Sequence, residues 1–105
     1  MATLEKDIER ALVRMIASHG GRCLKWVCPG WLGVPDRLCL LPGGWLIFVE
    51  TKSPKGSSRG AMQIRWAKWL TDLGFIHRWV YTKDDIAALD ALITERGGDR
   101  DVDPV

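Results

Sequence analysis

Three charged residues in the middle of the chain, Asp36, Glu50 and Lys52, have side chains suited to metal-assisted chemistry. Carboxylate oxygens are the ligands that Mg²⁺ and Mn²⁺ prefer in proteins. Two carboxylates held close together repel each other, and a divalent cation between them removes that repulsion. Because Lys52 lies two residues after Glu50, strand alternation places both side chains on one face of a sheet. The three residues therefore predict a metal centre with a lysine beside it, provided that the fold brings Asp36 to Glu50.

A β-hairpin is the element that would bring the two acids together. Residues 42–44, Pro-Gly-Gly, are typical of a turn, and apolar runs flank them on both sides. If these three residues form the loop, Leu41 pairs with Trp45, and counting back along both strands puts Asp36 opposite Glu50. Directly opposed residues share a face, with Cβ atoms about 5 Å apart. A loop of the two glycines alone would shift the register by one residue and turn the acids to opposite faces.

The remaining elements are predicted from apolar periodicity and from glycine and proline breaks. We expect helices over 4–18, 61–73 and from 83 onward, and strands over 22–27, 38–41, 45–49 and 76–81. The run 45–49 is apolar throughout, which is typical of a central strand buried on both faces. A loop of small residues, 53–60, follows Lys52 directly, and Thr82 is placed to cap the last helix. This order indicates a mixed α/β domain.

The composition indicates one ordinary globular domain. Of the 105 residues, 47% are hydrophobic and 27% are charged, and we expect a single domain over 1–98 with a disordered acidic tail over 99–105. The charged N-terminus lacks the apolar run of a signal peptide, and no stretch is apolar enough to span a membrane. Three cysteines are too few and too odd in number for a disulfide framework, so we expect a reducing, cytoplasmic setting.

Basic residues dominate the middle of the chain. Between Arg22 and Lys83 there are ten Lys or Arg against three acids, and two of those acids are Asp36 and Glu50. This distribution favours a polyanionic substrate held around a small acidic centre. The alternative interpretation is an ordinary solvated surface.

Other common chemistries lack their motifs. Cys23 and Cys28 are spaced like a loose zinc pair, but no second pair follows, and His19 and His77 are isolated, so core cysteines are the better interpretation. The glycine-rich loops that cradle nucleotide phosphates are absent from the sequence. No serine or cysteine has a histidine and an acid at a recognisable spacing, which leaves acyl transfer without support.

The residues that suggest a metal centre also carry a resemblance to a known family. Residues 35–36 (Pro-Asp), followed by 50–52 (Glu-Thr-Lys), resemble the PD-(D/E)XK nuclease signature. The segments EKDI, GVPDR and FVETK, with Gln63 further on, are similar to the VRR-NUC family, particularly its small stand-alone phage and bacterial members. The resemblance covers 4–93, although the VRR tripeptide itself is absent and 80–81 (Val-Tyr) stand in its place. It implies a restriction-endonuclease-like α-β-β-β-α-β core, with a mixed central sheet flanked by helices, and a C-terminal helix.

The resemblance implies which residues would bind the metal. Asp36 and Glu50 would bind Mg²⁺ or Mn²⁺, together with the backbone carbonyl of Thr51. On the first predicted helix, Glu5 would complete the metal shell, in one version through a water molecule. Glu9, one turn further on, is its rival for this role. Both helix acids could instead be ordinary surface charges.

Lys52 and Gln63 complete the implied site. Lys52 would orient or activate the attacking water and stabilise developing charge. We favour the electrostatic role, because a lysine beside metal-bound acids stays protonated. Gln63 would assist the phosphate or position Lys52. Five basic residues are expected to contact DNA: Lys25, Arg37, Lys55, Arg59 and Arg65.

The implied activity is metal-dependent hydrolysis of DNA phosphodiester bonds by an endonuclease. The resemblance further implies a homodimer that acts on branched DNA such as four-way junctions. Its setting would be the cytoplasm of the bacterial host if the chain is encoded by a phage. Six tryptophans in so small a chain also favour a dimer. Trp66 and Trp69, at helical spacing, are better explained by core or dimer contacts than by base stacking. Two alternatives remain open: a nuclease that cuts flaps, single strands or duplex ends, and an inactive DNA-binding scaffold.

Overall fold

The computed structural model of the chain describes residues 4–56 and 58–100. Its elements, in order, are α1 (Glu5–Ser18), β1 (Arg22–Lys25), β2 (Arg37–Leu41), β3 (Trp45–Thr51), α2 (Ala61–Asp72), β4 (Ile76–Val80) and α3 (Lys83–Arg100). This order and the mixed α/β class confirm the fold that the sequence predicts. The last helix is longer than expected, because α3 continues through Gly97 and Gly98. An internal glycine weakens a helix by only about 1 kcal/mol. Residues 99 and 100, expected in the acidic tail, are thus helical, and 101–105 lie outside the described residues.

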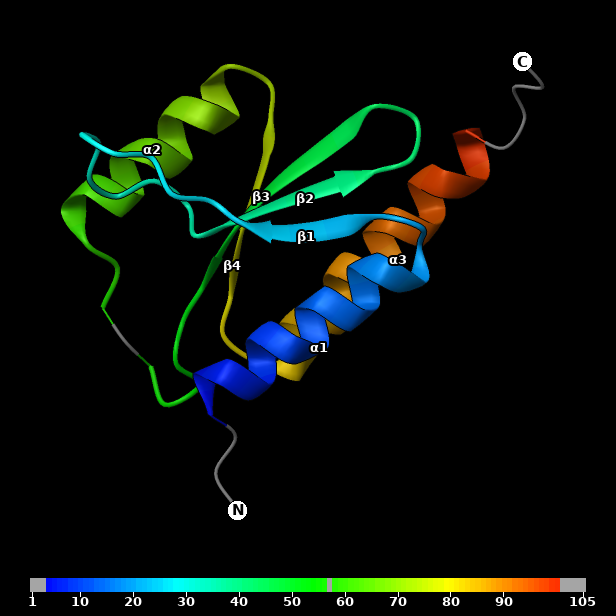
Figure 1. Ribbon diagram of the computed structural model, residues 1–105, viewed down its shortest axis with the longest axis horizontal. Coiled ribbons are helices and arrows are strands. Elements are labelled where there is room, and N and C mark those ends of the chain that lie inside the picture. The colour runs from blue at the N-terminus through cyan, green and yellow to red at the C-terminus, as the bar shows by residue number, and fades with distance from the viewer. Residues whose placement is uncertain (1–3, 57, 101–105) are drawn as a thin grey trace.

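The four strands form one mixed sheet in the order β1-β2-β3-β4. The pairs β1–β2 and β2–β3 are antiparallel, and β3 pairs with β4 in parallel. A parallel pair needs a crossover connection, and α2 supplies it. Figure 1 shows α1 and α3 together on one side of the sheet and α2 on the other. Among the described helices, none is long and apolar enough to cross a membrane.

The hairpin has the register that its turn residues predict. Leu41 pairs with Trp45, and the ladder runs back to Arg37 opposite Val49. The two loop glycines both have positive φ, 85° and 72°, a conformation that only glycine adopts without a steric penalty from Cβ. The pairing ends at Arg37, the residue that follows Asp36, so this acid lies just outside the ladder, at the point where the two strands separate.

The core lies between the sheet and the α1–α3 pair. Side chains with no solvent exposure come from α1, β2 and β3: Ile8, Leu12, Ile16, Cys39, Ile47 and Val49. Each buried aliphatic side chain contributes about 1.5–3 kcal/mol relative to an exposed one. β3 is an inner strand with helices over both faces of the sheet, so it is buried on both faces, as its apolar sequence predicts. This packing fixes the end of β3, where the ExK motif lies.

On the opposite face, α2 covers the sheet less completely. Only Leu70 of this helix is buried, whereas the side chains of Trp69 and Leu73 are 53% and 55% exposed. Trp66 packs its ring against Trp26 and Trp69, with ring centroids 6.1 and 5.0 Å apart. The apolar residues of α2 that we assigned to a core or a dimer contact therefore lie largely at the surface of the single chain.

Candidate active site

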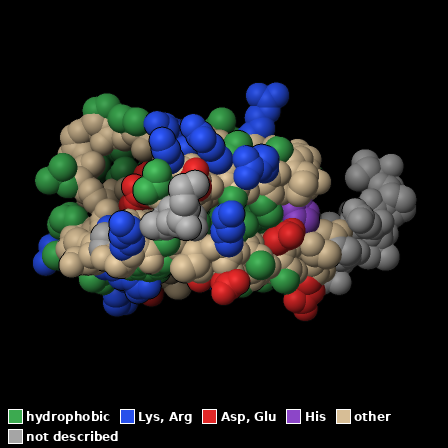
Figure 2. Space-filling model, turned by 90° about the horizontal axis from the view of Figure 1, so that it is seen from below, with side chains coloured by type: hydrophobic (Ala, Val, Ile, Leu, Met, Phe, Trp, Pro, Cys, Tyr) green, Lys and Arg blue, Asp and Glu red, His purple; other side chains and the backbone are tan. Residues whose placement is uncertain are grey.

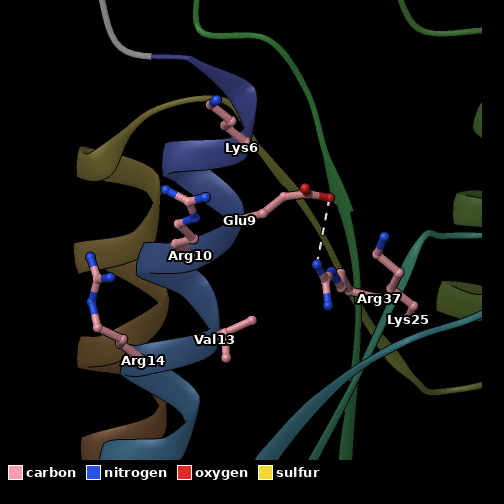
Figure 3. Close-up of a pocket in the computed structure, with 7 residues that line it drawn as sticks. All are labelled: Lys6, Glu9, Arg10, Val13, Arg14, Lys25 and Arg37. Carbon is pink, nitrogen blue, oxygen red and sulfur yellow. Dashed lines mark ion pairs between the residues drawn. The ribbon is translucent and has the colours of Figure 1, made fainter.

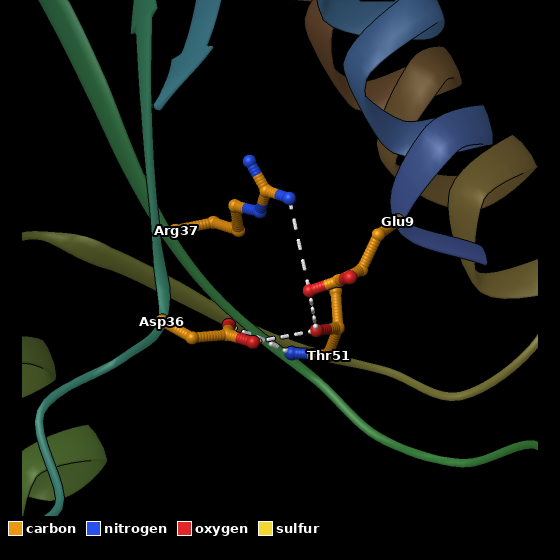
Figure 4. Close-up of polar contacts among 4 residues, drawn as sticks. All are labelled: Glu9, Asp36, Arg37 and Thr51. Carbon is orange, nitrogen blue, oxygen red and sulfur yellow. Dashed lines mark hydrogen bonds and ion pairs between the residues drawn. The ribbon is translucent and has the colours of Figure 1, made fainter. Parts of the chain in front are cut away.

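Asp36 is tied to the end of β3 by two hydrogen bonds. Its Oδ1 accepts the backbone N–H of Thr51 at 3.0 Å, and its Oδ2 accepts the Thr51 hydroxyl at 2.6 Å (Figure 4). Burial raises the pKa of Asp36, and the two bonds from Thr51 only partly oppose that effect. The β2–β3 ladder ends at Arg37 and Val49. Beyond that point these two bonds connect the strands, and they hold the Asp36 carboxylate beside the ExK motif.

Glu50 is buried next to Asp36, with only 7% of its surface exposed. Burial, and then the negative charge of Asp36, raise the pKa of Glu50 to about 7. The positive charge of Lys52 opposes this rise, and Glu5 adds to it. The hairpin thus brings the two predicted acids close enough to repel each other, as the register argument requires. A carboxylate with such a pKa is only partly charged near neutral pH unless a cation joins it.

Lys52 is also buried, and its ammonium group is held by neutral acceptors. Nζ donates to Oε1 of Gln63 at 2.7 Å and to the backbone carbonyl of Ser58 at 3.1 Å. The same Oε1 accepts the backbone N–H of Gly60 at 2.9 Å, which fixes Gln63 in the first turn of α2. The structure therefore joins two predicted site residues from different elements, with Gln63 in contact with Lys52.

The two acids of α1 approach the site in different ways. Glu9 places Oε1 at 3.3 Å from the Thr51 hydroxyl and at 3.7 Å from Nη2 of Arg37 (Figure 4). Glu5, in the first turn of the helix, is exposed and influences Glu50 through its charge. Glu9 contacts the motif directly through Thr51, so it is more than an ordinary surface charge.

The donor set fits a hard divalent cation that keeps part of its water shell. Within the described ranges, no three Asp, Glu, His or Cys side chains come together as a complete metal cage. Magnesium commonly binds through one or two carboxylates and retains several waters. Asp36 and Glu50 match that requirement, because burial raises the pKa of both carboxyl groups and a positive charge between them would oppose that rise.

The predicted DNA-contact residues are distributed around this site. Lys25 and Arg37 border a groove beside α1. Lys55, in the loop after β3, and Arg65, on α2, are exposed, and neither contacts the motif residues. Arg59, from the same loop as Lys55, is the most firmly positioned of the five.

Arg59 is held by two aromatic residues that our sequence reasoning missed. Its guanidinium lies 4.3 Å from the ring centre of Trp79, and its Nε donates to the Tyr81 hydroxyl at 3.1 Å. The Lys52 ammonium lies 6.0 Å from the same Trp79 ring. The signal for this contact is the parallel register that pairs Glu50 with Trp79, which a sequence read strand by strand does not reveal.

Comparisons with known proteins agree with the motif. No family model matches the chain. A phage protein named "Putative nuclease p44", from Acyrthosiphon pisum secondary endosymbiont phage 1, is 46% identical over 70 residues, which cover 67% of this chain and 74% of that protein. A solved structure described as a VRR_NUC domain aligns with a TM-score of 0.78 and 26% identity, over 84% of this chain and 95% of that one. Together with the hairpin-borne motif, these matches show that the chain belongs to the VRR-NUC family of nuclease domains.

Proposed function

We propose that this nuclease is a Mg²⁺- or Mn²⁺-dependent DNA endonuclease that acts as a homodimer on branched DNA, with four-way junctions as the preferred substrate. The observation that carries the proposal is the pair formed by the half-buried Asp36 and the buried Glu50, whose pKa values are both raised, beside the fixed ammonium of Lys52. Two neighbouring carboxylates that are shielded from water destabilise a fold unless a positive charge compensates them. The similarity of the chain to a phage protein named as a putative nuclease favours activity in the bacterial cytoplasm.

The metal would be held by Asp36, Glu50 and the backbone carbonyl of Thr51, with Glu5 or Glu9 completing the shell through water. A bound divalent cation supplies Lewis acidity and lowers the pKa of a coordinated water. The chain itself contributes the rigid placement of its ligands. Asp36 is fixed by its bonds to Thr51, and Glu50 is fixed by burial in β3.

Lys52 would stabilise the negative charge that develops on the phosphate. Its two acceptors, Gln63 and the Ser58 carbonyl, suit a charged ammonium that donates hydrogen bonds. A third donor position remains for a phosphate oxygen. Gln63 would then act as a positioning residue, because it directs Nζ and is itself anchored by Gly60.

DNA contacts would come from Lys25, Arg37, Lys55, Arg59 and Arg65. The clearest support is Arg59, since its contacts to two aromatic rings hold the guanidinium ready for a phosphate before DNA binds. Ordering a long side chain in advance lowers the entropy that binding must overcome.

The homodimer would use the apolar surface around α2. Trp31 and Leu32 in the loop between β1 and β2 are 63% and 78% exposed, and Ile64 and Trp69 on the helix are 49% and 53% exposed. A second copy of the chain would cover this surface and place two active sites in one particle. Two sites related by a two-fold axis suit a junction in which opposed strands are cut.

The test is cleavage of labelled four-way junction, flap, duplex and single-stranded DNA with Mg²⁺ or Mn²⁺. The wild type is compared with Asp36→Asn and with the control Asp72→Asn, which alters an exposed acid on α2. We expect paired nicks on the junction that are lost in Asp36→Asn and kept in the control. Cutting only of another substrate would refute the junction preference, and metal-dependent cutting that survives Asp36→Asn would refute the site. Junction binding without any cutting would favour the scaffold.

A further inference from the structure

A row of cations runs along α1 beside the candidate active site. Lys6, Arg10 and Arg14 follow one another at four-residue intervals, and all three are exposed. Residues four apart lie on one side of a helix, and at 1.5 Å per residue the row spans about 12 Å. Lys25 at the end of β1 and Arg37 at the start of β2 stand across from this row (Figure 3). This row was not predicted from the sequence, although its four-residue spacing is visible there.

Together these five basic residues line an open groove, which we call the α1 groove. Its volume is about 350 Å³, and its other lining residues are Val13 and a single acid, Glu9. The space-filling view in Figure 2 shows Lys and Arg side chains gathered on one face of the molecule, close to acidic side chains. The α1 groove is therefore strongly positive and adjoins a small acidic region.

Most cations of the α1 groove have no charged or hydrogen-bonding partner in the part of the chain that the structure describes. Within the described residues, Lys6, Arg10, Arg14 and Lys25 form no ion pair or side-chain hydrogen bond. Arg37 approaches Glu9 at 3.7 Å, a separation beyond hydrogen-bond length. A cluster of like charges raises the local potential and attracts a polyanion.

The α1 groove adjoins the catalytic acids through Glu9. This residue lines the groove, and its Oε1 lies 3.3 Å from the Thr51 hydroxyl, which in turn donates to Asp36. A strand lying in the groove would thus run directly past the acid pair.

We propose that the α1 groove binds the backbone phosphates of the DNA strand next to the phosphate that is cleaved. This inference rests on the proposed function and adds Lys6, Arg10 and Arg14 to the DNA-binding surface. Because the basic side chains of the α1 groove would contact phosphates and not base edges, they would position the strand without recognising its sequence.

The test compares the double variant Arg10→Gln/Arg14→Gln with the control Lys68→Gln, an exposed lysine on the other side of the sheet. Binding of the full chain to junction and duplex DNA is measured over a range of salt concentrations, in an Asp36→Asn background that prevents cutting. Each lost phosphate contact reduces the slope of log K against log salt by about 0.9. We expect the double variant to lose about 1.8 from the slope and roughly 50-fold in affinity near 0.1 M salt, with Lys68→Gln unchanged.

A second measurement locates the contacted phosphates. Neutral methylphosphonates replace single phosphates on either side of the cleaved one. Wild-type affinity should fall at consecutive positions on one side, and the double variant should be insensitive to the same replacements. Unaltered affinity and salt slope in the double variant, or an equal loss in Lys68→Gln, would refute phosphate binding in the α1 groove. Failure of the wild type to bind any of these DNAs would instead overturn the proposed function.

Discussion

Replacing Glu50 with glutamine should stabilise the metal-free protein at high pH. Burial and the neighbouring Asp36 raise the pKa of Glu50 from an ordinary 4.5 to about 7. The folded chain therefore holds this proton more tightly than the unfolded chain does. Stability contributed by the proton is fully present below pH 4.5 and is lost as the pH rises toward 7. Glutamine keeps the size of the side chain and removes the charge, so the variant should lack this loss.

The size of the effect follows from the same pKa. The interval between 4.5 and 7, at about 1.4 kcal/mol for each pH unit, gives roughly 3 kcal/mol. His77 is also buried, and its pKa is lowered to about 4, so its contribution is lost as the pH falls below 6.5. The two residues act in opposite directions between pH 4.5 and 6.5. His77 contributes equally to the free energy of unfolding of the variant and of the wild type. Subtracting one free energy from the other at each pH therefore removes the His77 contribution and leaves that of Glu50.

The assay is denaturant unfolding at pH 4 and pH 8, without divalent cations, of wild type, Glu50→Gln and the control Glu95→Gln on the exposed side of α3. We expect the gain from Glu50→Gln to be larger at pH 8 than at pH 4 by about 3 kcal/mol, and the control to show no such change. Added Mg²⁺ at pH 8 should raise the midpoint of the wild type and leave Glu50→Gln unaltered, because a ligand stabilises only the fold that binds it. An equal gain at both pH values would refute the reasoning from burial and repulsion.

Three further outcomes follow from single contacts. Lys52→Ala should reduce kcat by about 10²–10³-fold, a loss typical of removing one charge-stabilising donor, with Kd for DNA little changed. Lys55→Ala, three residues on in the exposed loop, should weaken DNA binding and leave kcat little changed. Equal losses of kcat and of DNA affinity in either variant, measured by kinetics and binding assays, would contradict this division of roles. Gly33→Ala should lower the free energy of unfolding more than Gly30→Ala, since both glycines have positive φ but only the Cβ at 33 would lie 2.6 Å from Met62; equal costs in denaturant titrations would contradict the clash. Trp69→Glu should give monomers in sedimentation at micromolar concentration, while Thr71→Glu on the same helix stays dimeric, and a monomeric wild type would remove the basis for the interface.

The hairpin was predictable because its information is local. A Pro-Gly-Gly turn fixes the loop length, loop length fixes the register, and the register places Asp36 beside Glu50. The same argument placed Lys52 on the face of Glu50 by alternation. The burial of β3 was predictable from its uninterrupted run of apolar residues.

Contacts between distant elements were less accessible. The clamp on Arg59 depends on the parallel pairing of β3 with β4, and no turn connects those strands to set their register. The choice between Glu5 and Glu9 depends on how α1 crosses the sheet, which apolar periodicity defines only as a face. The row of Lys6, Arg10 and Arg14 was visible in the spacing, but its meaning required Lys25 and Arg37 to lie opposite.

The position of the acid pair explains how so small a domain tolerates it. Asp36 lies where β2 and β3 separate, so Thr51 can give both its N–H and its hydroxyl to the carboxylate. The apolar core packs on the α1–α3 side, whereas Lys52 contacts Gln63 of α2 on the other side of the sheet. Mutations in the core and at the proposed site should therefore be close to additive in their effect on stability. The charge repulsion at Glu50 is a local cost, which we expect substitution to remove together with activity and a bound cation to offset while activity is kept.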